Sequence, residues 1–206
     1  MADSSHEYST RDILIEATSK RLWIADESEL RILDICQETN LSTSVIYGHF
    51  RSRQGLIDAS LLHLFTIVTK QILENLKLMV TGPHPSGSFV DTLYELLTHP
   101  ENQVQITSQR QMFFRVSASA LSRPSIRPGF QKLYDEFVVQ KDEHYDELVR
   151  RQLLSDQLTG HQWALFFEGQ MLSRAFHDLS SEWDEQEDWN RAARRLLSAA
   201  EPETIF

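Results

Sequence analysis

The chain has 206 residues, of which 41% are apolar and 24% charged, so it can bury a core in one large domain or two smaller ones. A single cysteine, Cys36, excludes an intramolecular disulfide, and no stretch reaches the roughly 18 continuous apolar residues of a membrane helix. The N-terminus lacks the apolar centre of a signal peptide, so we expect a cytoplasmic protein without a membrane partner, and the net charge of −10 is unusual for a nucleic-acid binder.

The first predicted helix covers residues 10–25 and follows a polar segment, residues 1–9, that we expect to be disordered. Thr10 is its expected N-cap. Residues at helical spacing form its apolar stripe, namely Leu14, Ala17, Thr18 and Leu22. The spacing predicts that this stripe faces a core.

A second and a third short helix follow, joined by a tight turn. The second is predicted over residues 29–39 with Ser28 as its cap, and Asn40 suits the left-handed conformation at the turn. The third helix begins after Ser42 and ends near Phe50. A helix of about eight residues is too short to be stable alone, so it must pack on the first two.

The third helix has an outward side that can contact a partner. Its apolar residues Val45, Ile46 and Phe50 fall on one side, whereas Thr43, Ser44, Tyr47 and Gly48 fall on the other. Hydroxyls and backbone N–H groups at the start of a helix suit phosphates and base edges. Candidate DNA-contacting residues are Ser28, Ser42, Thr43, Ser44, Tyr47, Gly48, His49, Arg51 and Arg53. On the residues alone, the three hydroxyl residues could also be only a cap and Tyr47 only a core residue.

The local charge of this segment differs from that of its surroundings. Residues 1–60 hold six Lys or Arg against ten Asp or Glu, but no acid lies between Glu38 and Asp58. Charges farther apart than about 8 Å are screened at physiological salt, so the local sign matters most. The acidic remainder predicts weak non-specific DNA binding, and the gap in acids could also arise by chance.

Longer helices separated by Pro- and Gly-rich loops make up the rest of the chain. The apolar periodicity predicts helices over residues 53–80, 89–98, 101–121, 130–154, 161–179 and 188–200. The two clearest loops are residues 81–88 and 123–129. The pattern predicts an all-α fold of about nine helices.

Residues 35–53, ICQETNLSTSVIYGHFRSR, resemble the signature of the TetR family of transcriptional regulators. The most specific part is Leu41-Ser42 followed by Tyr47-Gly48-His49-Phe50, and the resemblance extends over about residues 10–60. Four positions depart from the family pattern: Asp26 and Asn40 replace glycines, Cys36 an alanine, and Leu30 a Thr or Ser cap. Leu30 removes a hydroxyl that would reach a phosphate, unless Ser28 takes over that role.

The resemblance implies a three-helix helix-turn-helix DNA-binding domain in residues 1–55 and an all-helical effector-binding and dimerisation domain in residues 56–206. The third helix would enter the major groove, and Arg53 would hold a phosphate. A homodimeric repressor would bind a pseudo-palindromic operator of double-stranded DNA and leave it when a small, mostly apolar or aromatic effector binds. The alternative is a helical sensor or carrier of small molecules whose degenerate helix-turn-helix does not bind DNA.

Two sets of residues are candidates for the effector and the partner subunit. The expected ligand-binding residues are Gln109, Met112, Phe113, Phe137, His144, Phe167 and Met171. The expected dimer-interface residues are Trp163, Phe166, Gly169, Leu172, Ala175, Phe176 and Leu196. Burial in the chain's own core is the alternative for both sets.

No group of residues predicts catalysis, a cofactor or a bound metal. The histidines show no His-x-x-x-His spacing, and there is no glycine-rich phosphate loop. The acids around His144 fit a solvated helix face, and Cys36 fits a small buried apolar residue. We therefore expect a protein that is not an enzyme.

Overall fold

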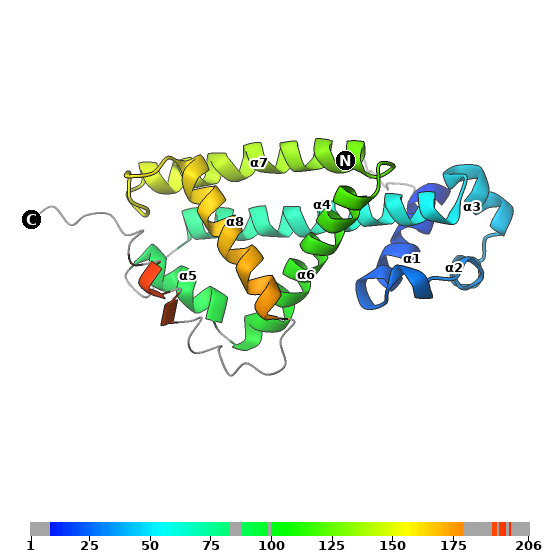
Figure 1. Cartoon of the computed structure of the whole chain (residues 1–206), viewed down its shortest axis with the longest axis horizontal. Coiled ribbons are helices and arrows are strands. Elements are labelled where there is room, and N and C mark those ends of the chain that lie inside the picture. Colours follow the sequence, from blue (N-terminus) through cyan, green and yellow to red (C-terminus); the bar gives the residue numbers. More distant parts are fainter. Residues whose placement is uncertain are drawn as a thin grey trace, which may run out of the picture. The chain divides into compact units, whose positions relative to one another are not determined.

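The computed structural model describes residues 9–82, 88–98, 100–178, 191–192, 194–196 and 198. Regular secondary structure in these residues is entirely helical, which confirms the predicted all-α fold. In chain order the elements are α1 (Thr10–Ile24), η1 (Glu27–Glu29), α2 (Ile32–Thr39), α3 (Thr43–Phe50), α4 (Arg53–Thr81), α5 (Phe89–Thr98), α6 (Pro100–Ser122), α7 (Arg127–Arg150) and α8 (Gly160–His177) (Figure 1). Residues 1–8 of the segment expected to be disordered, the middle of the first loop and most of the helix predicted over residues 188–200 lie outside the described residues.

The chain forms two compact units, and each is assembled from separate stretches of sequence. Unit 1 contains the residues up to Ile67 together with Arg115–Leu133, and unit 2 contains Val68–Phe114 and the residues from Tyr134 onward. Three helices, α4, α6 and α7, therefore contribute residues to both units. The boundary predicted after residue 55 lies in the first turn of α4, within unit 1.

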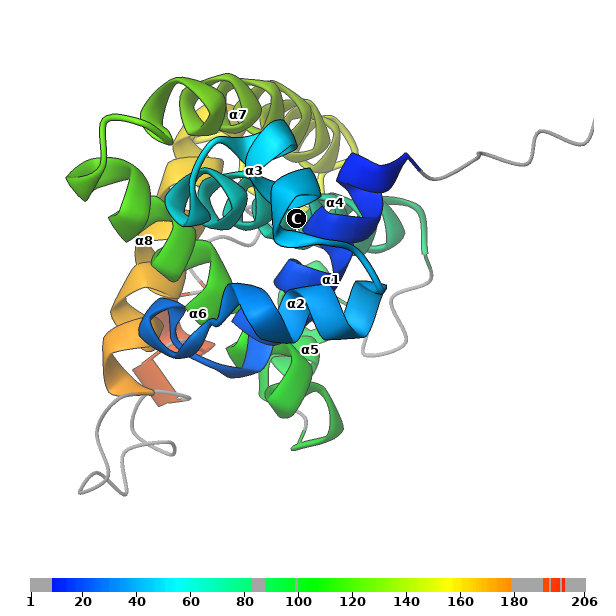
Figure 2. The same ribbon diagram turned by 90° about the vertical axis from the view of Figure 1, so that its right-hand side faces the viewer.

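The core of unit 1 joins the first three α-helices to the start of α4. Figure 2 shows α2 and α3 as short helices that run in different directions. Six buried apolar side chains form this core: Leu14, Ile15, Ile35, Ile46, Phe50 and Leu56. Ser19 of α1 also donates a buried hydrogen bond of 3.2 Å to the carbonyl oxygen of Ser60 in α4. Each large apolar side chain that is buried contributes about 1.5–3 kcal/mol of transfer free energy. This packing holds the short α3 in place, which would not be stable alone.

The start of α2 differs from the prediction. Residues 27–29 form a turn of 3₁₀-helix, and α2 begins only at Ile32, with Arg31 at its N-cap position and no side-chain capping bond. Leu30 between them is 6% exposed, so the residue that replaces a hydroxyl is an apolar anchor of the connection. Ser28 lies in the 3₁₀ turn and is exposed; the prediction that it caps α2 was wrong.

The other predicted turns and caps are mostly found. Asn40 adopts the left-handed conformation with φ 54°, and Ser52 Oγ accepts the Gly55 N–H at 2.9 Å at the start of α4. A Cβ at position 55 would lie 2.2 Å from the Phe50 carbonyl oxygen, so only glycine fits this tight connection. Helix α1 is capped by Ser9, whose Oγ accepts the Asp12 N–H, and not by Thr10 as expected.

Unit 2 has an aromatic core between the second half of α4, α5, α7 and α8. Trp163, Phe167 and Tyr145 lie within it, and the rings of Tyr145 and Phe167 stack with their centroids 5.5 Å apart. The first residue of α8 is Gly160, where a Cβ would lie 2.4 Å from the backbone nitrogen of Asp146 in α7. This close approach fixes where α8 begins.

Helix α4 is the one helix in the described part of the chain whose length and composition would allow it to cross a membrane. Half of its most apolar stretch is buried inside the protein. Core helices of water-soluble proteins show the same combination, because they are surrounded by other helices.

Candidate nucleic-acid interface

Helix α3 is divided into a buried and an exposed side. Ile46 is fully buried and Phe50 is 8% exposed, whereas Tyr47 is 47% exposed. Thr43, Ser44, Gly48 and His49 are exposed as well, and Val45 is half-buried. The predicted division of this helix into two sides is therefore confirmed, and the exposed side is polar and without acids.

The first turn of α3 keeps its hydroxyls and backbone donors at the surface. Ser42 occupies the N-cap position, but its side chain makes no capping bond; its Oγ lies 2.7 Å from Ser44 Oγ instead. The first N–H groups of a helix have no partner within the helix, so this end can bind an anion or a base edge. Position 48 has open space around it, so a side chain would fit in the free protein.

The two arginines after α3 differ in what they contact. Arg51 is exposed and ends the helix with φ 63°, its N–H donating to the Tyr47 carbonyl oxygen at 2.9 Å. Arg53 is half-buried, and its Nε donates to the Leu30 carbonyl oxygen at 2.9 Å while Nη2 donates to that of Glu27. Arg53 thus ties the start of α4 to η1, a structural role that the sequence interpretation missed.

A second set of interactions in unit 1 holds η1 and the end of α1 to the corner between α6 and α7. Arg123 forms ion pairs with Glu27 and with Asp58, the latter at 3.3 Å. Arg115 donates to the Leu22 carbonyl oxygen at 2.6 Å, and Ser125 donates to Asp58 at 2.7 Å. Helical periodicity carries no signal for such contacts, because the hydrogen bonds among them join residues that are 67 to 96 positions apart in the sequence.

The candidate ligand residues lie in unit 2 and form two aromatic groups. Met112, Phe113 and Phe137 are buried, and the rings of Phe113 and Phe137 are 6.1 Å apart. Phe167 belongs to the second group, with Tyr145. The remaining candidates are half-buried: Gln109, His144 and Met171. Burial lowers the pKa of His144, as does Lys77, although Glu143 opposes the shift.

A polar cluster around the buried Lys141, which the sequence analysis did not predict, lies beside the first aromatic group. Lys141 is 5% exposed and forms an ion pair with Glu168, and Tyr134 donates to the same carboxylate at 2.8 Å. The Lys141 ammonium also lies 5.3 Å from the centre of the Phe137 ring. Burial and the neighbouring Glu168 carboxylate raise the pKa of Tyr134. The only hint in the sequence is that residues 134, 137 and 141 share one side of a helix.

The candidate dimer residues of α8 separate into two groups. Trp163 and Ala175 are 5% and 9% exposed, and the Trp163 indole N–H donates to the Ser155 carbonyl oxygen at 2.8 Å. Both are core residues of their own unit, so their burial does not favour an interface, and their assignment to one stays a prediction. Leu172 and Phe176 are 41% and 67% exposed, Leu196 is 45% exposed, Gly169 is exposed and Phe166 is half-buried.

Metal binding has no support in the described part of the chain. Its His, Cys, Asp and Glu side chains form no group of three or more that could hold a metal ion. Cys36 is half-buried in α2 beside the core of unit 1.

Comparison of the sequence finds no matching family model and no matching curated protein. The structure, in contrast, is similar to solved regulators. A TetR-family transcriptional regulator from Cytophaga hutchinsonii superposes with a TM-score of 0.63 at 12% identity, over 93% of this chain and 94% of that one. The reduced form of NemR from E. coli gives 0.61 at 12% identity, over 91% and 96% of the two chains.

A third similar structure is the multidrug binding protein EbrR complexed with imidazole, with a TM-score of 0.58 at 17% identity over 96% of this chain and 97% of that one. All three similarities extend over almost the whole of both chains, so they cover unit 1 and unit 2 alike. The chain therefore has the fold of the TetR-family transcriptional regulators, as the resemblance of residues 35–53 predicted.

Proposed function

We propose that the protein is a DNA-binding transcriptional regulator of the TetR type that acts as a ligand-responsive repressor in the cytoplasm. One observation carries this proposal: the exposed side of α3 is polar and free of acids, while its other side is buried in the core of unit 1. A helix held in this way can enter the major groove without losing its packing. No catalytic role is proposed.

On this proposal, the exposed residues of α3 contact the operator. Thr43 and Ser44 would bind base edges or phosphates through their hydroxyls, and Tyr47 would contact the backbone or a thymine methyl group. Gly48 would let the helix approach the groove wall closely, which explains a residue without a side chain where one would fit. Arg51 and His49 would supply local positive charge, and Arg53 would act chiefly by positioning η1.

We further propose that two copies associate through the exposed apolar stripe of α8. Leu165, Gly169, Leu172 and Phe176 recur at intervals of four, three and four residues, so they lie along one side of the helix. Three of them are large apolar residues that are 41–67% exposed. A homodimer would place two α3 helices about 34–36 Å apart, the spacing that a pseudo-palindromic operator requires.

The proposed effector is a small, mostly apolar or aromatic molecule that binds in unit 2 beside Phe113 and Phe137. The neighbouring cluster of Lys141, Glu168 and Tyr134 would provide the few polar contacts that orient such a ligand. The imidazole complex of EbrR supports the idea that this fold accommodates small molecules. Release from DNA would require two conformations, of which only one binds DNA. The effector would have to bind more tightly to the conformation that cannot bind DNA.

A helical sensor or carrier without DNA binding is the second candidate function. The net charge of −10 favours it, and so does Leu30, which puts a buried apolar side chain where a hydroxyl would contact a phosphate. These two observations do not affect the exposed side of α3, so we prefer the regulator.

A gel shift separates the two functions. The purified protein is mixed with the DNA upstream of its own gene at two salt concentrations, and an unrelated fragment of equal length serves as the control. The proposal expects specific retention that weakens at the higher salt concentration, because released counterions contribute to binding. Equal or absent retention of both fragments would favour the carrier.

A further inference from the structure

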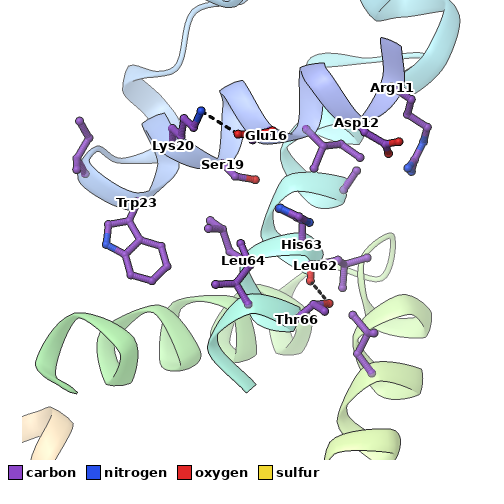
Figure 3. A pocket seen from close by; sticks show the side chains of 15 residues that line it. Arg11, Asp12, Glu16, Ser19, Lys20, Trp23, Leu62, His63, Leu64 and Thr66 are labelled. Atoms are coloured by element: carbon purple, nitrogen blue, oxygen red, sulfur yellow. Dashed lines mark hydrogen bonds and ion pairs between the residues drawn. The ribbon is translucent and has the colours of Figure 1, made fainter. Parts of the chain in front are cut away.

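Unit 1 carries an open groove between α1 and the middle of α4, with a volume of about 980 Å³ (Figure 3). Its wall is mainly apolar and includes Ile15 of α1, Ala59, Leu62 and Ile67 of α4, and Leu133 of α7. Sites for small molecules are usually apolar concavities of about 300–1,000 Å³ with few polar groups. The groove is distinct from the proposed effector site in unit 2.

The groove is elongated, because it follows almost the whole length of α1. Arg11 and Trp23 line its two ends and are twelve residues apart in the sequence, which corresponds to about 18 Å along a helix. Figure 3 shows Trp23 at one end and Arg11 at the other. Trp23 is 36% exposed and Ile67 45% exposed, so the groove offers an accessible aromatic and aliphatic surface.

The charges around the groove are unevenly paired. Lys20 forms an ion pair of 2.9 Å with Glu16, and Asp12 accepts a hydrogen bond of 2.7 Å from Ser9. The Arg11 guanidinium lies 5.5 Å from the centre of the Phe50 ring and, among the described residues, has no carboxylate within ion-pair distance. The groove therefore combines a long apolar wall with a cation at its end, Arg11, that forms no ion pair with any other described residue.

We propose that this groove binds a free, elongated amphiphilic anion, whose acidic group contacts Arg11 and whose apolar chain lies along α1 and α4 towards Trp23. The apolar chain would cover the exposed parts of Trp23 and Ile67, which gains transfer free energy in proportion to the area buried. A single soluble molecule is the fitting occupant, since Arg11 stands at one end of a single apolar path that follows α1 for about 18 Å.

The occupant would also contact residues that support α3. Ile15 belongs both to the groove wall and to the core that contains Ile46 and Phe50. Arg11, which would bind the acidic group of the ligand, lies over the Phe50 ring. Binding would therefore affect α3 through the residues that pack against its buried side. The binding itself does not depend on the proposed function and can be measured without DNA.

The first test uses the full-length protein labelled with 5-fluorotryptophan and titrated with decanoate. The fluorine resonance of Trp23 is assigned from the Trp23→Phe variant, and that of Trp163, buried in unit 2, serves as an internal control. We expect the Trp23 resonance to shift to saturation while the Trp163 resonance stays in place. A shift of the Trp163 resonance alone, or no shift of either, would overturn the proposal.

The second test asks whether the ligand must be both apolar and anionic. Decanol lacks the charge and acetate lacks the chain, so each should bind more weakly than decanoate. Arg11→Gln should weaken decanoate binding by about fivefold, as expected for one exposed charged contact, and leave decanol binding unchanged. Asp12→Asn should strengthen decanoate binding, because it removes a negative charge of the groove lining that is adjacent to Arg11 in the sequence.

The matched control for Arg11 is Arg31→Gln, which removes an exposed arginine of unit 1 that does not line the groove. It should bind decanoate as the unmodified protein does. Equal losses in the two arginine variants, or equal affinities for decanol and decanoate, would show that Arg11 does not select an anion, and the proposal would fail.

Discussion

Helices α3 and α8 each bury one side and expose the other, but the two exposed sides differ in chemistry. The exposed side of α3 carries hydroxyls, a phenol and a glycine, whereas that of α8 carries Leu165, Leu172 and Phe176. A polar helix surface gains little by leaving water unless its partner offers hydrogen bonds, while an apolar one gains from any apolar partner. The difference supports the proposals that α3 contacts a nucleic acid and that α8 contacts a second copy of the chain.

The largest expected effect comes from the buried side of α3. Ile46 is fully buried, so Ile46→Ala should lower the free energy of unfolding by about 2–5 kcal/mol through lost transfer free energy and a cavity. Thr43→Ala, on the exposed side, is the matched control and should change stability by less than about 0.5 kcal/mol. Urea denaturation followed by circular dichroism measures both. Similar losses in the two variants would mean that the sides of α3 are not as different as their burial indicates.

The corresponding change on α8 should alter association and leave folding intact. Leu172→Glu combined with Phe176→Glu places two charges on the exposed apolar stripe, so the dimer dissociation constant should rise by at least about 100-fold. Sedimentation velocity gives the oligomeric state, and Ser173→Glu, also exposed, is the control. A monomeric unmodified protein, or an unchanged dimer in the double variant, would contradict the proposed use of this stripe.

Arg53 tests whether the residue behind α3 is structural. Arg53→Gln removes the charged donors to the carbonyl oxygens of Leu30 and Glu27, and we expect a loss of about 1–3 kcal/mol in the free energy of unfolding. Arg51→Gln removes an exposed arginine from the adjacent turn and should leave stability almost unchanged. Thermal unfolding of the two variants provides the comparison. Equal stability of the two would leave Arg53 with only a surface role.

Tyr47 tests the exposed side of α3 directly. Tyr47→Ala should weaken operator binding by about tenfold, equivalent to about 1.4 kcal/mol, with stability unchanged within about 0.5 kcal/mol. Val139→Ala truncates an exposed side chain of unit 2 and should leave operator binding as it is. Fluorescence anisotropy with labelled operator DNA gives the affinities. Full binding by Tyr47→Ala would remove this residue from the interface.

The smallest expected effect concerns pH. The pKa of His144 is lowered in the folded protein, so the unfolded chain takes up its proton first as the pH falls. The ionisation of His144 therefore does not change the free energy of unfolding above the unfolded pKa of about 6.5. As the pH falls below that value, it lowers the free energy of unfolding progressively. His144→Gln should weaken this part of the acid dependence, measured as the midpoint of urea unfolding at pH 7.5 and pH 5.5. His63→Gln, on an exposed histidine of unit 1, is the control.

The apolar residues of each helix recur at the period of an α-helix, and this pattern predicted most of the fold. The ends of α3 and α5 agree with the prediction, and those of α1 and α4 differ by one residue. The two sides of α3 were also predictable. When its eight residues are placed at helical spacing, the apolar ones fall on one side and the polar ones on the other, so only one side can be buried.

Prediction failed where distant residues decide the local structure. Leu30 looked like a missing cap, but it is an anchor because the chain folds into a 3₁₀ turn before α2 and Arg53 bonds its carbonyl oxygen. The contacts that enclose Trp163, from the Ser155 carbonyl oxygen and neighbouring rings, could not be predicted either, because α8 is apolar nearly all round. Neither contact leaves a periodic signal in the sequence.

Unit 1 is assembled from two separate stretches of the chain, and this matters for the design of chimaeras between regulators of this fold. A fragment that stops at Ile67 lacks Arg115, Arg123 and Ser125, which bond Leu22, Glu27 and Asp58. Those acids and that carbonyl oxygen would then be left without their partners, at a cost of about 1–3 kcal/mol for each group that stays buried. A chimaera that transplants α1–α3 onto another regulator should therefore carry the α6–α7 corner with it.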